Sequence, residues 1–169
     1  INLTGGFISL STLNYTRWEY MLAHFSTPFS KFLEIYKPPF FERIGLRYID
    51  AFSREKLGIQ DKPWTELIQS TWLGAIAFVE ETRVIGSGLD VEYFLDNDVS
   101  RVKVHAGPGN VNNAPETAFI VDRDFIHIGN ERIEKFDSIV NYLHDNSGKF
   151  IRSVITDTLH TAMVPEELT

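Results

Sequence analysis

The sequence predicts an α+β fold: a mainly antiparallel sheet of about five strands, covered on one face by two long helices. Three observations lead to this class. Several short segments alternate apolar and polar residues, as half-buried strands do. Two longer stretches, 13–37 and 131–164, repeat apolar residues at steps of three and four, as amphipathic helices do. The element order is strand, helix, strand, short helix, three strands, long helix, and the short turns between the last strands make those strands antiparallel.

The first two elements are a short strand and a long helix. Residues 7–12, "FISLST", alternate Ile8 and Leu10 with serines, which indicates a strand. The helix predicted over 13–37 contains Pro28, and a proline inside a helix removes one backbone hydrogen bond. The apolar spacing continues across Pro28, so we expect one kinked helix. Two abutting helices, with Pro28 at the first position of the second, are the alternative.

The second strand is "FFERIGLRYIDAF", residues 40–52. Ile44, Leu46 and Tyr48 fall on one face. Arg43, Gly45 and Arg47 fall on the other, because successive side chains of a strand point to opposite faces. A polar connection, 53–62, leads to a weaker helical pattern over 63–77.

Three further strands are predicted over 83–95, 101–106 and 117–127, with "GPGNVNNAP" as the loop before the last of them. Arg123 falls on the apolar face of the last strand and fits that face badly, so we place it near a strand end. The final element is a single long helix over 131–164, kinked where Gly148 interrupts it and ended by Pro165.

Composition limits the classes of function. The chain has 169 residues, 43% of them hydrophobic, and we expect one domain over 1–169. Its net charge is −7 with no basic run, which argues against binding nucleic acid. No apolar run reaches the roughly 20 residues of a membrane span. The absence of cysteine favours a reducing compartment, the cytoplasm. Because the first residue is Ile1, we expect the chain to lack an N-terminal segment of the full-length protein.

Motifs for cofactors, metals and nucleophiles are weak. The glycine-rich pieces "GSG" (86–88) and "GPGN" (107–110) match neither the P-loop nor the dinucleotide-binding fingerprint. The five histidines have no metal-ligand spacing, and no serine stands in a nucleophile elbow. We therefore expect no cofactor, no metal and no catalytic nucleophile.

Charged residues on the predicted strands offer the best candidate site. The polar faces carry Arg43 and Arg47, then Asp90 and Glu92, then a basic row at 101–105, then an acidic row at 122–124. If strands adjacent in sequence pair, rows of opposite sign face each other, and opposite charges across a strand pair stabilise it by roughly 0.2–1 kcal/mol each. We expect such a charge ladder. Alternatively, Arg43 and Arg47 receive a carboxylate or phosphate, or the strand carboxylates act as acid and base.

Four stretches together carry a family resemblance: "GFISLST", "NYTRWEYM", "EIYKPPFFERIGLRYID" and, near the end, "KFIRSVITDTL". The chain resembles a sporadically distributed bacterial family of uncharacterised proteins marked by a "RIGLRYIN" strand. Asp50 stands where that motif usually has asparagine. Members of the family typically have a further N-terminal segment. The resemblance covers most of the chain and implies no activity, substrate or cofactor.

The function that these observations favour is a non-enzymatic binding or assembly module, with a homodimer or an unidentified protein as partner and neither nucleic acid nor membrane. A surplus of aromatic residues, 13% of the chain, supports it, because such residues line ligand cavities and interfaces. The candidate ligand contacts are Arg43, Arg47, Asp90 and Glu92. The alternative is a hydrolase-like enzyme using strand carboxylates. Any dimer is expected to form through an edge strand or through the helix over 13–37.

Overall fold

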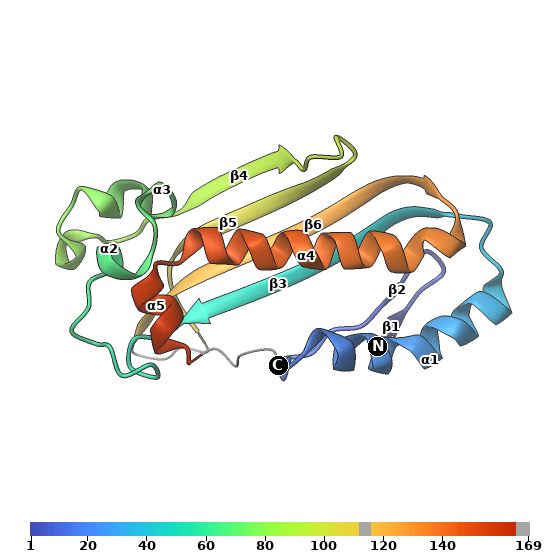
Figure 1. Ribbon diagram of the computed structural model, residues 1–169, viewed down its shortest axis with the longest axis horizontal. Helices are drawn as coiled ribbons and strands as arrows, with labels where there is room; N and C mark the ends of the chain where they lie inside the picture. The colour runs from blue at the N-terminus through green and yellow to red at the C-terminus, as the bar shows by residue number, and fades with distance from the viewer. Residues whose placement is uncertain (112–115, 165–169) are drawn as a thin grey trace. The chain divides into compact units, whose positions relative to one another are not determined.

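The computed structural model describes residues 1–111 and 116–164 and divides the chain into two compact units, Ile1–Phe41 and Glu42–Thr169. Each unit is described by itself. The fold combines helices with antiparallel sheets, as the sequence predicts (Figure 1). The prediction of a single domain over 1–169 stays a prediction.

The first unit contains a small hairpin and a long helix. Strands β1 (Asn2–Leu3) and β2 (Ile8–Ser9) pair antiparallel in a separate two-stranded sheet, so the segment 7–12 adds no strand to the main sheet. Helix α1 (Trp18–Tyr36) runs continuously through Pro28, and the alternative of two helices is wrong. It ends at Lys37, which adopts a left-handed conformation (φ 46°) and donates its N–H to the Leu33 carbonyl.

Aromatic side chains follow one another along this helix. The rings of Phe25 and Phe29 are stacked with centroids 5.1 Å apart, and Phe29 also stacks on Phe41 at 5.8 Å. Phe32 and Tyr36 continue the series at 5.2 Å. Steps of three and four residues place these rings on one side of the helix, which confirms the amphipathic pattern over this segment.

The main sheet belongs to the second unit apart from its first residue, Phe41. It has four strands, β3 (Phe41–Phe52), β4 (Leu89–Phe94), β5 (Ser100–Asn110) and β6 (Thr117–Glu131), in the order β3-β6-β5-β4. Strand β5 pairs antiparallel with β4 and β6, and Figure 1 shows β3 and β6 running in opposite directions. Strands adjacent in sequence do not always pair here, because the last strand lies between β3 and β5. The edges of the sheet are therefore β3 and β4.

The connection from β3 to β4 consists of short helical pieces. They are α2 (Trp64–Leu67), α3 (Ser70–Leu73), η1 (Gly74–Ala77) and η2 (Glu81–Arg83), so the single helix predicted over 63–77 is wrong. Strand β4 begins at Leu89, six residues later than predicted from 83–95. The preceding backbone passes close to β5, because a Cβ on Gly107 would lie 2.5 Å from the Ser87 carbonyl oxygen.

Strands β5 and β6 are longer than the sequence indicates. Residues 107–110 of the glycine-rich "GPGN" segment belong to β5 rather than to a loop, and they pair with 117–120 of β6. The rest of the predicted loop includes 112–115, which lie outside the described residues.

The chain ends in η3 (Ile133–Lys135), α4 (Phe136–Val154) and α5 (Asp157–Ala162). The single helix predicted over 131–164 is wrong, because it breaks after Val154. Ile155 forms a β-bridge with Ile68, and the Thr156 N–H donates to the Leu67 carbonyl at 2.9 Å. The Thr156 side chain then caps α5. Gly148 remains inside α4.

The core lies between α4 and one face of the sheet (Figure 1). Phe150 is buried, and its ring meets Phe125 of β6 edge-on at 6.2 Å. Ile151 is half-buried, so its predicted place in the core is only partly right. The fully buried large side chains of this unit are Trp64, Leu67, Ile68, Val102, Val104, Phe119, Val121, Phe125, Leu143, Val154 and Leu159.

Candidate functional site

The charged side chains singled out in the sequence lie on the sheet face away from α4. Arg123 of β6 bonds Ser147 of α4, so Asp122 and Asp124, its neighbours in the strand, point to the opposite side. We call this surface the charged sheet face. It consists of Arg43, Arg47, Asp90, Glu92, Arg101, Lys103, His105, Asp122 and Asp124.

The two arginines of β3 pair with the two aspartates of β6. Arg47 donates from Nε to Asp122 Oδ1 at 2.7 Å and from Nη2 to the other oxygen of the same carboxylate. Arg43 donates from Nη2 to Asp124 Oδ2 at 3.1 Å. The Arg43 guanidinium passes beside Gly45, where a Cβ would lie 3.4 Å from Nη2. Because Gly45 has no side chain, the Arg43 guanidinium can lie beside it. Arg43 and Arg47, four residues apart, can therefore both reach aspartates of β6 that are only two residues apart.

The other half of the charged sheet face joins β4 to β5. Asp90 stands opposite His105 and its Oδ1 lies 2.9 Å from His105 Nδ1. Glu92 stands opposite Lys103, and its Oε1 lies 3.1 Å from Arg101 Nε. In the next strand pair Lys103 stands opposite Asp124, and His105 opposite Asp122.

Across the sheet, the rows therefore alternate in sign: basic on β3, acidic on β6, basic on β5 and acidic on β4. The charge ladder expected from the sequence is present, although the strands that carry it stand in a different order. Arg47 meets Asp122 rather than Asp90 or Glu92, which lie at the other edge. The four candidate ligand contacts thus form no single cluster.

These ion pairs lie at the surface. The side chains of Arg43 and Arg47 are 57% and 59% exposed. The hydrogen bond to the Asp122 carboxylate is the main cause that raises the pKa of the Arg47 guanidinium. Burial raises the pKa of the Asp124 carboxyl, and this outweighs the opposite effect of Arg43. Exposed pairs of this kind stabilise a fold by about 0–1 kcal/mol.

A second ionic cluster, under α4, has no counterpart in the sequence predictions. Arg123 is only 4% exposed; its Nε donates to Ser147 Oγ at 2.9 Å and its Nη1 pairs with Asp50. The guanidinium carbon lies 5.1 Å from the centre of the Tyr48 ring. The Tyr48 hydroxyl is 2.9 Å from His144 Nδ1. Arg123 is therefore not near a strand end but at the centre of a network joining β3, β6 and α4.

A serine, a histidine and a glutamate also form a chain of contacts at the C-terminal end of β6. Ser100 Oγ lies 2.8 Å from His127 Nδ1, and His127 Nε2 lies 3.2 Å from Glu131 Oε1. Lys135 donates to the other Glu131 oxygen at 2.8 Å, and this bond is the main cause that lowers the Glu131 pKa. The order of groups is that of a catalytic triad.

Burial gives that chain of contacts a structural role. Ser100 is 0% exposed, and its Oγ accepts a hydrogen bond from Asn97 Nδ2 at 2.9 Å. A nucleophile must reach its substrate, and this hydroxyl is closed off from any carbonyl group outside the protein. The cluster instead ties the β4–β5 turn to β6.

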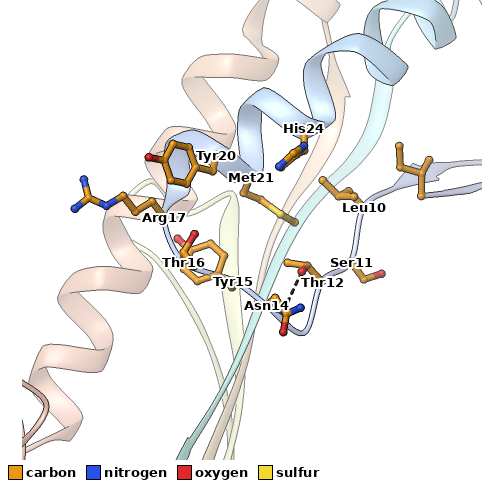
Figure 2. Close-up of a pocket in the computed structure, with 11 residues that line it drawn as sticks. Leu10, Ser11, Thr12, Asn14, Tyr15, Thr16, Arg17, Tyr20, Met21 and His24 are labelled. Carbon is orange, nitrogen blue, oxygen red and sulfur yellow. Dashed lines mark hydrogen bonds between the residues drawn. The ribbon is translucent and has the colours of Figure 1, made fainter.

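Two surface hollows are described, and neither involves the charged sheet face. The first, about 480 Å³, lies in the first unit between the segment 10–17 and the start of α1 (Figure 2). Figure 2 draws the hydrogen bond from the Asn14 N–H to Thr12 Oγ1, 3.0 Å long, and shows the Arg17 side chain extending away from the others. The second hollow, of similar size, is lined by residues of the β3–β4 connection. Charged residues line the second hollow: Arg54, Asp61, Lys62, Glu80 and Glu81. Two of them, Arg54 and Glu81, pair with each other at 2.7 Å.

Metal sites and membrane spans are absent from the described ranges, 1–111 and 116–164. These ranges contain no group of three or more histidine, aspartate or glutamate side chains placed to hold a metal ion. They also contain no helix long and apolar enough to cross a membrane.

Comparison with known proteins gives no match to any family model, curated protein or solved structure. The resemblance to the RIGLRYIN family therefore stays a prediction.

Proposed function

We propose that this chain is a non-enzymatic protein-binding module that takes up an extended segment of a partner along the edge strand β3. The observation that carries the proposal is the position and length of this strand. Strand β3 has 12 residues and stands at the end of the sheet order. Within the part of the chain that the structure describes, β6 is its only neighbour in that sheet.

A long edge strand is a template for an additional strand, because half of its backbone N–H and C=O groups point away from the sheet. Protein modules use such edges to bind extended peptides, with affinity from the backbone hydrogen bonds and specificity from alternate side chains. The opposite edge, β4, has only 6 residues. Strand β3 therefore offers the longer template.

The carboxylates do not favour a hydrolase over this proposal. Asp90 and Asp122 are each engaged by a basic residue of a neighbouring strand. The sheet face that carries them lies outside both described hollows. A net charge of −7 supports a protein partner rather than nucleic acid. The lack of cysteine supports the bacterial cytoplasm as the proposed compartment.

Peptide selection followed by hydrogen exchange tests the proposal. A displayed library of random peptides, each as long as the 12 residues of β3, is selected for binding to the whole chain. Hydrogen–deuterium exchange with mass spectrometry then locates the backbone amides that each selected peptide protects. We expect protection to increase in Phe41–Phe52, because strand addition turns solvent-exposed amides into hydrogen-bonded ones.

The matched control is the same peptide with alternate backbone amides N-methylated, which removes its donors and keeps its side chains. Loss of binding on methylation supports strand addition. Selected peptides that protect other segments and leave β3 unchanged would contradict the proposal.

A further inference from the structure

We infer that the segment bound along β3 belongs to a different protein and carries acidic residues at alternate positions, facing Arg43 and Arg47. This inference rests on the proposed function and adds the chemistry of the partner. It starts from the sign of the charges on each strand. Each of the three strand pairs in the sheet joins a basic row to an acidic row on the charged sheet face.

Strand β5 shows what a basic row looks like with neighbours on both sides. Lys103 stands between Glu92 of β4 and Asp124 of β6, and His105 stands between Asp90 and Asp122. In both neighbours the acidic residues are two apart, so that they lie on the same face of their strand. A basic row in this sheet is thus flanked by two strands with the pattern acid-x-acid.

Among the residues that the structure describes, β3 has such a neighbour on one side, β6. Asp122 and Asp124 of β6 approach Arg47 and Arg43 from that side. More than half of each arginine side chain remains exposed, and the guanidinium group has five N–H donors. The bonds to β6 use two nitrogens of Arg47 and one of Arg43. A second acid-x-acid strand would complete for β3 the arrangement that β5 already has.

The same charges argue against a second copy as the occupant. Two β3 strands paired with each other would bring arginine rows side by side, and like charges oppose strand pairing. The acidic edge strand β4 of another copy has the right sign. That contact would be head-to-tail, however, and would build a closed ring or an open filament of many copies. A segment of a different protein satisfies the charges without such an assembly.

A peptide copying residues 117–128 is a suitable probe, because β6 is the strand that already pairs with β3. The labelled peptide carries Asp122 and Asp124, and the control peptide carries Asp122→Lys and Asp124→Lys. Binding to the whole chain is measured by fluorescence anisotropy at low salt, with hydrogen exchange to confirm protection of Phe41–Phe52. We expect the acidic peptide to bind about tenfold more tightly than the lysine peptide. High salt should reduce the difference.

Variants of the protein assign this preference to β3. The double variant Arg43→Gln, Arg47→Gln should bind both peptides within about twofold of each other. Lys103→Gln, on the same face but on the central strand β5, should retain the preference. Circular dichroism checks that all variants fold.

The outcomes separate this inference from the proposed function. Equal affinity of the two peptides, with β3 protected in both cases, would overturn the acidic partner and leave strand addition intact. Binding of neither peptide to β3 would count against both. Concentration-dependent rings or filaments of the wild-type chain, abolished by Asp90→Lys and Glu92→Lys, would show that a second copy is the occupant.

Discussion

Two ion pairs join the same strands, β3 and β6, on opposite faces of the sheet, and we predict very different contributions from them to stability. Asp50 pairs with Arg123 under α4, whereas Arg47 pairs with Asp122 on the charged sheet face. The Arg123 side chain is 5% exposed and that of Arg47 is 59% exposed. Each pair joins an arginine to an aspartate, and the two arginines differ greatly in burial.

Replacing Asp50 by alanine leaves the Arg123 cation buried, with Ser147 Oγ as a neutral acceptor and the Tyr48 ring nearby. Removing one partner of a buried pair costs about 3–5 kcal/mol. The Asp50 side chain is 36% exposed, so water can partly replace its carboxylate, and we expect a cost near the lower limit, about 3 kcal/mol. Arg47→Ala should cost less than about 1 kcal/mol.

Urea denaturation followed by far-UV circular dichroism measures both values. The control is a double-mutant cycle with Arg123→Met. In Asp50→Ala, Arg123→Met the stranded cation is gone, so much of the stability lost in Asp50→Ala should return. High salt should weaken the Arg47–Asp122 pair and leave the Asp50–Arg123 pair nearly unchanged. An Arg47→Ala variant as unstable as Asp50→Ala would refute the assignment of buried and exposed pairs.

Three further predictions concern pH and packing. Because burial raises the folded-state pKa of Asp124 above 3.8, its contribution to stability is present at low pH and declines as pH rises through that pKa. Asp124→Asn should therefore lose less stability than wild type between about pH 4 and pH 7 in urea denaturation; an unchanged or steeper loss would contradict this. Burial and the bond to Asp96 raise the pKa of Tyr142 from 10.0 to about 12. The folded protein therefore loses stability as the pH rises from 10 to about 12. In an ultraviolet titration, the tyrosine that ionises at the highest pH should be missing from Tyr142→Phe. Phe150→Ala should lower the free energy of unfolding by about 3–5 kcal/mol. Ile151→Ala should lower it clearly less, because Phe150 is buried and Ile151 is half-buried. Equal losses in the two variants would contradict this assignment of the core.

Much of the fold follows from local patterns in the sequence. Alternation along 40–52 correctly gives the two faces of β3, and steps of three and four give α1 through Pro28. The charge rows also give the ladder, because their alternation in sign is compatible with both the expected and the observed strand order. These features depend on neighbours in sequence or on the charge of whole strands, and both can be read from one chain.

The rest depends on contacts between distant residues. The final helix breaks because Ile155 and Thr156 meet Ile68 and Leu67, which the helical spacing of apolar residues does not reveal. Arg123 fits badly in a strand pattern until Asp50, 73 residues away, supplies its partner. The misfit itself was the signal: a basic residue on an apolar face requires a buried acid. Asp50, on the helix-facing side of β3, is an acidic residue that can meet this requirement, so the two residues together indicate a buried network.

The position of β6 between β3 and β5 also has a consequence for how the chain is made. Arg47 of β3 and Asp122 of β6 are 75 residues apart. At a synthesis rate of about 5–20 residues per second, β3 emerges from the ribosome roughly 4–15 s before the strand that will cover one of its edges. During that interval two nascent copies on one messenger RNA would present arginine rows of the same sign to each other. Repulsion between the arginine rows opposes pairing of β3 with the β3 strand of a neighbouring nascent chain, so that β3 stays available for β6 of its own chain.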